Sequence, residues 1–445
     1  MLLRLPSSHA QPLLRKIIAA GLEAADSYQA LLRTVSREGH SLRVGHRTYD
    51  LAQYDRVLAV GAGKASARMA QALERVLGSR LEGGLVVVKT GHRLRTKRIS
   101  IVEAGHPIPD LAGLQAAEQL RVLIHDLTSR DLLFVLLSGG TSSLLPAPVP
   151  GVTLANKQRT TRLLLRSGAT IQEVNAVRKH LSLLKGGGLA ASTKATIATL
   201  ILSDVIGDDL SSIGSGPTTP DPTTFADAIG ILRRYRVWRG VPASVRQYLL
   251  QGQKGAVPET LKSSSRLLRR VHHEIIGNND GMLDAVAQAA RTAGLHTARL
   301  STALTGEAHE VAKQFARLAR RIAMGRGVLR RPACVVAGGE PTVRVTGRGK
   351  GGRAQEFASA AAFDIAGLPN VWLAAMGTDG TDGPTDVAGA VVTGETVARA
   401  ERIGVNLGSA LRRHDTYSAL KALGCHIRTG PTGTNVNDLY LLLIL

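Results

Sequence analysis

Short apolar runs alternate with glycine-rich loops and helical segments through much of this chain, and this alternation restricts its fold more than any other feature. The run 56–60 is followed by Gly-Ala-Gly-Lys-Ala-Ser and a helical pattern to about Leu77, and the run 132–137 by Ser-Gly-Gly-Thr-Ser-Ser. Strand–helix alternation is typical of a parallel sheet covered on both faces, with ligands bound beyond the carboxyl ends of its strands. We therefore predict an α/β fold whose N-terminal part is a doubly wound, mostly parallel, Rossmann-like sheet.

The length of the chain predicts two domains, because 445 residues exceed one ordinary hydrophobic core. Residues 251–270 are rich in Gly, Ser, Lys and Arg and are typical of a linker. We place the N-terminal domain at 1–262 and a smaller C-terminal α/β domain at 263–445. Apolar residues at helical spacing predict a first helix over residues 11 to about 36.

The glycine loops of the N-terminal part are typical of anion sites, because free amides and a helix dipole point at the turn. Lys64 adds a full charge to the first loop. The loop is not a P-loop, and as a dinucleotide fingerprint it is incomplete because Ser66 replaces the third glycine. Asp204 follows the apolar run 196–202, a usual position for a metal ligand or general base. The candidate binding residues here are Gly61, Gly63, Ser138, Gly139, Gly140, Thr141, Ser142, Asn175 and Arg178.

A second group of candidate residues lies between 338 and 386. The segment 347–353 alternates glycine with Arg and Lys, including Lys350 and Arg353, and Glu356 lies in the helix that follows. A cation such as Arg353 at a helix start is unfavourable unless an anion is near. The loop 377–386 then supplies Asp379 and Asp382. Asp204, Asp379 and Asp382 are hard oxygen ligands without nearby Cys or His, which favours Mg²⁺ or another hard divalent cation.

The charge and cysteine content bear on partners and compartment. The net charge is +22, but the arginines are spread along helices and aromatic residues are 3%, so a solvated basic face is favoured over a nucleic-acid-binding surface. The two cysteines lie in or beside apolar runs, and no disulfide framework is indicated. We expect a cytoplasmic protein, since no apolar run approaches the ~20 residues of a membrane span.

Nine motifs in register give a resemblance that covers nearly the whole chain from Leu13. They are VGAGKAS, GHPIPD, LLSGGTSSLL, NAVRKHLSLLKGG, LSDVIGDD with SGPT, GGEPTV, GKGGRAQE, GTDGTDGPTD and PTGTNVNDL. With these motifs the chain resembles the glycerate 2-kinase family, whose C-terminal part is the MOFRL domain, here about 332–445. The resemblance implies two α/β domains with the active site in the cleft between them. It also implies phosphorylation of D-glycerate at its 2-hydroxyl, using ATP and a divalent metal.

The resemblance also implies roles for individual residues. The essential lysine and arginine of the family fall on Lys64 and Arg353, and its acidic positions on Asp204 and Asp379. One departure is Ala354, which stands where the family has Asn, so a contact of that amide is lost or replaced. Glycerate and ATP are the expected partners, without a specific nucleic acid or a membrane, and a homodimer stays open. The rival functions are an NAD(P)H-dependent hydroxypyruvate reductase and a basic nucleic-acid-binding protein.

Overall fold

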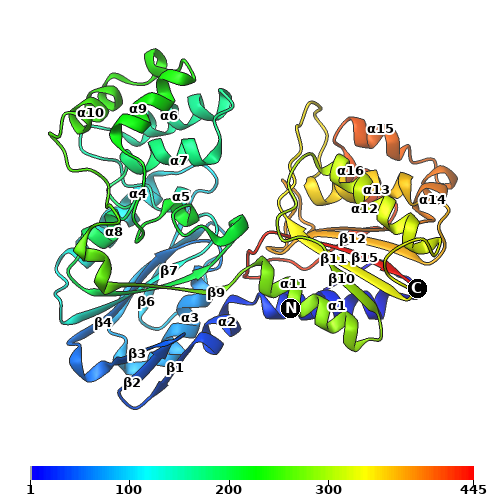
Figure 1. The fold of residues 1–445 in the computed structure, drawn as a ribbon, viewed down its shortest axis with the longest axis horizontal. Coiled ribbons are helices and arrows are strands. Elements are labelled where there is room, and N and C mark those ends of the chain that lie inside the picture. The colour runs from blue at the N-terminus through cyan, green and yellow to red at the C-terminus, as the bar shows by residue number, and fades with distance from the viewer. Residues whose placement is uncertain (1–2) are drawn as a thin grey trace. The chain divides into compact units, whose positions relative to one another are not determined.

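The computed structural model describes residues 3–445 and separates the chain into two compact domains (Figure 1). The first domain is Ser27–Ile276, and the second combines Met1–Asp26 with Gly277–Leu445. This division differs from the boundary expected after residue 262. Strand β9 (Val271–Gly277) is the edge strand of the first-domain sheet, and helix α1 (Gln11–Ala24) packs against helix α11 (Asn279–Thr292) of the second domain.

The first domain contains the predicted doubly wound sheet. Its six strands lie in the order β6-β5-β4-β7-β8-β9, which is 3-2-1-4-5-6 in chain order, and the pairs from β6 to β8 are parallel. This is the Rossmann order, in which the connections reverse direction between β4 and β7. The other strands are β4 (Arg56–Ala62), β5 (Gly83–Lys89), β6 (Ile99–Ala104), β7 (Asp131–Leu137) and β8 (Thr196–Leu202).

The helices of the first domain form two groups. Helix α3 packs on β5 and β7, whereas α4 and α8 contribute to a core with the same strands. Helices α6, α7, α9 and α10 enclose a separate small core, and Figure 1 shows them gathered beyond one end of the sheet. The bounds are α2 (Ser27–Thr34), α3 (Ser66–Leu77), α4 (Leu111–His125), α5 (Thr141–Leu144), α6 (Leu154–Arg166), α7 (Ile171–His180), α8 (Gly188–Ala191), α9 (Phe225–Arg234) and α10 (Ala243–Gln253). A three-stranded sheet of β1 (Val35–Glu38), β2 (Ser41–Val44) and β3 (Arg47–Asp50) completes the domain.

The second domain is also α/β, but its sheet is mostly antiparallel. The six strands lie in the order β10-β11-β15-β12-β13-β14, in which β10 and β11 pair in parallel and the other neighbours pair antiparallel. The last strand, β15 (Asp438–Ile444), lies in the middle between β11 (Ala333–Gly339) and β12 (Val371–Gly377). The remaining strands are β10 (His296–Arg299), β13 (Gly389–Thr393) and β14 (His426–Ile427).

Helices cover both faces of the second-domain sheet. Figure 1 shows α1 and α11 on one face, with α12 (Ala308–Ala323) and α13 (Arg353–Asp364) on the other. On this second face, the helices and the sheet enclose a single hydrophobic core, which is completed by α14 (Thr396–Arg402), α15 (Leu407–Arg412) and α16 (Thr416–Ala422). The single helix predicted over 11–36 is wrong, because α1 ends at Ala24 and α2 begins at Ser27 in the other domain.

Within residues 3–445, no helix is long and apolar enough to cross a membrane. Both cysteines, Cys334 and Cys425, are buried free thiols.

Candidate active site

The loops after β4 and β7 meet at the switch point of the first-domain sheet. We call residues 63–65 the β4 loop and residues 138–140 the β7 loop. Gly63 has φ +141°, and a Cβ there would lie 2.0 Å from the Ser138 hydroxyl, so only glycine allows this approach. Gly61, by contrast, lies inside β4, where a Cβ would lie 2.1 Å from the Leu136 carbonyl oxygen. Gly61 therefore serves strand packing, whereas Gly63 shapes the loop.

The hydroxyls of Ser138 and Thr141 hold these loops together. Ser138 Oγ accepts a hydrogen bond from the Ala65 amide at 3.1 Å and lies 3.0 Å from Ser66 Oγ. Thr141 Oγ1 lies 2.5 Å from the Ala62 carbonyl oxygen and 2.7 Å from that of Ser138, and its one hydroxyl hydrogen is shared between them. Both side chains are buried. These hydroxyls therefore fix the shape of the two loops, and their direct contact with a ligand stays a prediction.

Lys64 lies in the β4 loop, two residues before helix α3 begins. Its amide donates to the Gly139 carbonyl at 2.9 Å, and its own carbonyl lies 3.1 Å from His92 Nδ1. These contacts fix the backbone of Lys64 against the β7 loop. The structure therefore brings together Lys64, Gly63, Gly139 and Gly140 as the sequence predicted.

A chain of hydroxyls continues from the β7 loop toward helix α7. Ser142 Oγ lies 3.0 Å from Ser215 Oγ, and Ser215 donates to Asn175 Oδ1 at 3.1 Å. Ser142 and Asn175 are therefore joined in one network beside the β7 loop. Within that loop, Gly140 has φ +91°, and a Cβ there would come within 2.9 Å of the His106 ring.

Three buried or partly buried cations, together with the exposed Arg162, line a pocket of about 320 Å³ next to this network, and we call it the cation pocket. Lys157 comes from α6, Arg178 from α7, and Lys185 from the segment after α7. Burial, with repulsion from Arg178, lowers the pKa of Lys157 to about 7. Burial and the other two cations lower the pKa of Lys185 well below its usual value, and burial lowers that of Arg178. Sequence reasoning predicted Arg178 and missed both lysines.

Asp204 is partly exposed just beyond the carboxyl end of β8. This is the predicted position for a carboxylate that orients a substrate or contacts a metal. Asp209 instead accepts hydrogen bonds from the Ser211 amide at 3.0 Å and from the Ser211 and Ser212 hydroxyls, so it stabilises the following turn.

In the second domain, Arg353 is bound to two acids. Arg353 Nε and Nη2 donate to Asp438 at 2.7 and 3.0 Å, and Nη1 donates to Glu340 at 2.6 Å. Burial opposes the charge of Arg353, but the two carboxylates outweigh it and raise the pKa of the guanidinium. Burial also raises the pKa of Asp438 to about 6, against the opposing effect of Arg353.

The antiparallel register of β15 explains how Asp438 reaches Arg353. Asp438 begins β15 and pairs with Gly339 at the end of β11 and with Gly377 at the end of β12. Glu340 follows β11 directly. The ends of two strands, the start of a third and the N-terminus of α13 therefore meet at Arg353. The anion expected near the start of α13 is therefore supplied by the carboxylates of Asp438 and Glu340.

Asp382 does not have the geometry of a metal ligand. Its two oxygens accept from the Ala354 and Gln355 amides at 3.0 and 2.9 Å and from Gln355 Nε2 at 2.9 Å. The side chain is buried, and burial raises its pKa despite these hydrogen bonds. Asp382 caps the first turn of α13, and this role disfavours the predicted role of Asp382 as a metal ligand.

The remaining predicted residues of this domain surround α13. Asp379 Oδ1 accepts from the Thr381 amide and hydroxyl at 3.0 and 2.9 Å. Glu356 is buried and lies 2.9 Å from His414 Nδ1. Lys350 is exposed, with its ammonium 4.6 Å from the centre of the Tyr417 ring. Among residues 3–445, no cluster of three or more His, Cys, Asp or Glu suits a metal ion.

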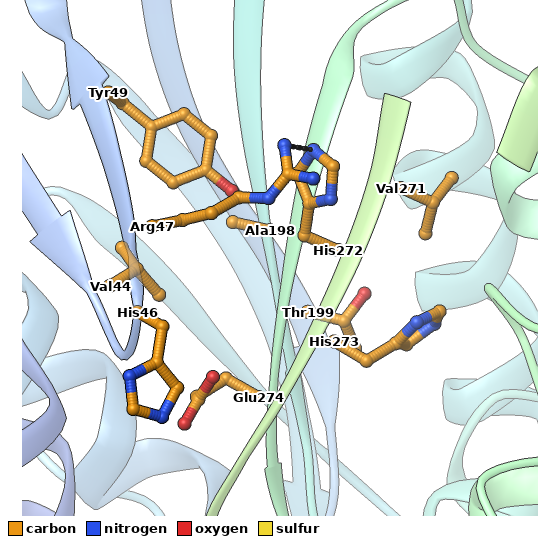
Figure 2. Close-up of a pocket in the computed structure, with 10 residues that line it drawn as sticks. All are labelled: Val44, His46, Arg47, Tyr49, Ala198, Thr199, Val271, His272, His273 and Glu274. Atoms are coloured by element: carbon orange, nitrogen blue, oxygen red, sulfur yellow. Dashed lines mark hydrogen bonds between the residues drawn. The ribbon is translucent and has the colours of Figure 1, made fainter. Parts of the chain in front are cut away.

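A further pocket of the first domain, about 330 Å³ in volume, contains no predicted residue (Figure 2). The hairpin β2–β3 contributes His46, Arg47 and Tyr49, and β9 contributes His272, His273 and Glu274. Arg47 Nη1 lies 2.7 Å from His272 Nε2. Burial lowers the pKa of both His272 and His273. This pocket lies along β8 and β9 rather than at the switch point.

These features define a two-domain α/β protein in which glycine loops and Lys64 meet at the switch point of the first-domain sheet. Residues 13–250 match the family described as a domain of unknown function, DUF4147, and residues 333–438 match the MOFRL family. The chain belongs to this DUF4147–MOFRL family, which confirms the resemblance found in the motifs.

Relatives support the same assignment along the full length. Glycerate 2-kinase from Pyrococcus horikoshii is 40% identical over 96% of this chain and 96% of its own. A protein of Agrobacterium vitis with a provisional hydroxypyruvate reductase name is 40% identical over 98% of this chain and 94% of its own. The crystal structure of glycerate kinase from Thermotoga maritima is 38% identical, covers 98% of this chain and 99% of its own, and superposes with a TM-score of 0.85.

Proposed function

We propose that this protein is an ATP-dependent kinase that phosphorylates D-glycerate at the 2-hydroxyl to give 2-phosphoglycerate. The observation that carries the proposal is the 40% identity to a glycerate 2-kinase across 96% of both chains. It is supported by the switch-point loops of the first domain, which place Lys64 at the carboxyl ends of β4 and β7. Phosphoryl transfer needs alignment and charge stabilisation more than covalent catalysis.

Lys64 is proposed to stabilise the charge of the phosphoryl group in flight. Its backbone is fixed by the Gly139 carbonyl, so the loop needs little reorganisation when an anion binds. Asp204 is proposed to orient the attacking hydroxyl. Arg353 has N–H groups beyond those used by Asp438 and Glu340, and these can donate to an oxyanion while the two acids hold the guanidinium in place.

The residues fit ATP better than they fit a protein-bound metal. The glycine loops place a lysine before the N-terminus of helix α3, where phosphate oxygens are favoured. Since no cluster of three or more His, Cys, Asp or Glu exists among residues 3–445, we propose that Mg²⁺ is held mainly by substrate phosphates, with Asp204 or Asp379 as a carboxylate contact. A bound metal would supply charge neutralisation on the phosphates.

The reductase alternative is favoured by the Rossmann strand order and by the Agrobacterium vitis name. A dinucleotide site needs an acidic residue at the end of the second strand for the ribose, and β5 ends in Lys89. Ser66 also replaces the third glycine, and its hydroxyl bonds the Leu136 carbonyl at 3.3 Å. The missing acid opposes NADH binding, and the missing third glycine opposes binding of either dinucleotide.

The deciding experiment incubates purified protein with D-glycerate, ATP and Mg²⁺ and resolves 2-phosphoglycerate from 3-phosphoglycerate. A parallel reaction contains hydroxypyruvate with NADH or NADPH. We expect 2-phosphoglycerate in the first reaction and no cofactor oxidation in the second. Cofactor oxidation without phosphoglycerate would overturn the proposal.

A further inference from the structure

The cation pocket of the first domain contains charges that the fold does not neutralise. Lys157 and Lys185 are 7% and 3% exposed. Lys157 Nζ is shielded from solvent and has no hydrogen-bond partner among the described residues. Among the described residues, Lys185 Nζ reaches only the Leu145 carbonyl, at 3.5 Å. The lining residues of the pocket, all within residues 3–445, include no Asp or Glu.

Lys179, beside Arg178, provides a comparison within the same domain, because it is a buried lysine with a structural role. Lys179 follows Arg178 on α7, is 5% exposed, and pairs with buried Asp221 at 3.3 Å. An acid is therefore present where a cation is only structural. Burying an unpaired ammonium costs several kcal/mol, and two beside an arginine add mutual repulsion. Such a cost is typical of a site that binds an anion.

The position of the pocket joins it to the proposed active site. Ser142 lines the pocket and directly follows the β7 loop and Thr141. The same loop carries Gly139, whose carbonyl accepts from the Lys64 amide at 2.9 Å. Asn175 and Arg178 lie one turn apart on α7, and Asn175 is joined to Ser142 through Ser215. An anion in the pocket would therefore lie beside the loops that carry Lys64.

We propose that the cation pocket binds the carboxylate of the hydroxy-acid substrate, with Lys157, Arg178 and Lys185 as its specificity-determining residues. This inference rests on the proposed function. Glycine loops and Lys64 are already available for the phosphoryl groups, and the carboxylate is the remaining substrate charge. A guanidinium suits a planar carboxylate, which it binds with two parallel hydrogen bonds. Apolar walls formed by Pro107, Pro146 and Leu154 exclude water and strengthen the attraction.

The test compares Lys157→Met and Lys185→Met with a matched control, Lys194→Met. Lys194 is an exposed lysine of the same domain that does not line the pocket. Each pocket variant should raise KM for glycerate about 10- to 100-fold, the scale of a lost hydrogen bond to a charged group. KM for ATP should change by less than about twofold, because the lost contact is made with glycerate and not with ATP. The control should behave as the wild type.

Melting temperature gives a second readout that does not need turnover. Sodium glycerate should raise Tm of the wild type and of Lys194→Met, and uncharged glycerol should not. The shift should be lost in Lys157→Met, whose unliganded Tm should exceed that of the wild type because a buried unpaired charge is gone.

Three results would overturn the inference. A selective rise in KM for ATP would assign the pocket to a nucleotide phosphate, and unchanged kinetics in both pocket variants would remove it from the reaction. An equal glycerate shift in Lys157→Met and wild type would show that the carboxylate binds elsewhere. If the wild type forms no phosphoglycerate, the proposed function fails, while the melting comparison still decides whether the pocket binds this carboxylate.

Discussion

Arg353 and Asp438 form a bidentate ion pair in which the arginine begins a helix and the carboxylate begins the central strand β15. Asp438 is 1% exposed, and its Oδ2 also accepts from Tyr440 at 2.9 Å. The Asp438 carboxylate neutralises part of the guanidinium charge and fixes the plane of the guanidinium. Arg353 therefore has a structural role in the second domain in addition to the role we propose in phosphoryl transfer.

The first prediction concerns the stability supplied by this pair. Arg353→Met should lower the free energy of unfolding by about 3–5 kcal/mol, because buried Asp438 loses its compensating charge. Adding Asp438→Asn to that variant should restore part of the loss. Urea denaturation measures both, with Arg348→Met as the control because Arg348 is an exposed cation of the neighbouring loop. Equal unfolding midpoints for Arg353→Met and the control would contradict this role.

The helix start at Arg353 was predictable, but its partner was not. Glycines at 351 and 352 followed by helix-forming residues give a local signal, and α13 begins at Arg353. Asp438 is 85 residues further along the chain, and its position depends on an antiparallel register that no local pattern specifies. The same reason explains why the expected boundary after residue 262 differs from the division in the structure, since the pairing of β9 and the packing of α1 are long-range contacts.

The second prediction separates capping from metal binding at Asp382. Asp382→Asn places an amide group against backbone amides of α13, so the free energy of unfolding should fall by about 2 kcal/mol. The Mg²⁺ concentration for half-maximal turnover should not change. Asp379→Asn, a change at a partly exposed carboxylate, is the comparison and should raise that concentration. An increased Mg²⁺ requirement with normal stability in Asp382→Asn would restore its assignment as a ligand.

The third prediction concerns Lys64. Lys64→Met should lower kcat by about 10²-fold or more, the scale expected for losing a group that stabilises transition-state charge. Its melting temperature should stay near that of the wild type, because the hydrogen bonds that fix the loop come from the Lys64 backbone. Steady-state kinetics and thermal melting are measured together, with Lys194→Met as the control. A variant that melts early and keeps normal kcat would make Lys64 structural.

The lysines of the cation pocket could not be predicted from the sequence in the way that the loops could. Loops after strands were recognisable because glycine and hydroxyl residues interrupt apolar runs, and the structure places them together at the switch point. Lys157 gives no such signal. It is one lysine on the helix α6, which also carries exposed arginines, and only the packing of α7 and the following segment buries it. The available sequence signal was the helical spacing of Lys157 with Leu154 and Leu164, which lie toward the domain interior.

The last prediction follows from the titration of Lys157, which Arg178 and Lys185 surround. Its pKa is about 7 in the folded protein and 10.5 when exposed, so between these values the unfolded chain binds a proton that the folded chain does not. Stability should therefore rise with pH across this window, by at most about 1.4 kcal/mol per pH unit from this group. Lys157→Met lacks this contribution, so subtracting its pH profile of unfolding from that of the wild type isolates Lys157 from other titrating groups. Unfolding in urea at pH 6, 7, 8 and 9 measures the profile, without ligand and with saturating glycerate. A bound carboxylate should keep Lys157 protonated and flatten the difference, because ion pairing raises a lysine pKa. A difference profile that is flat without ligand would show that Lys157 keeps an ordinary pKa and that its burial has been compensated within the fold.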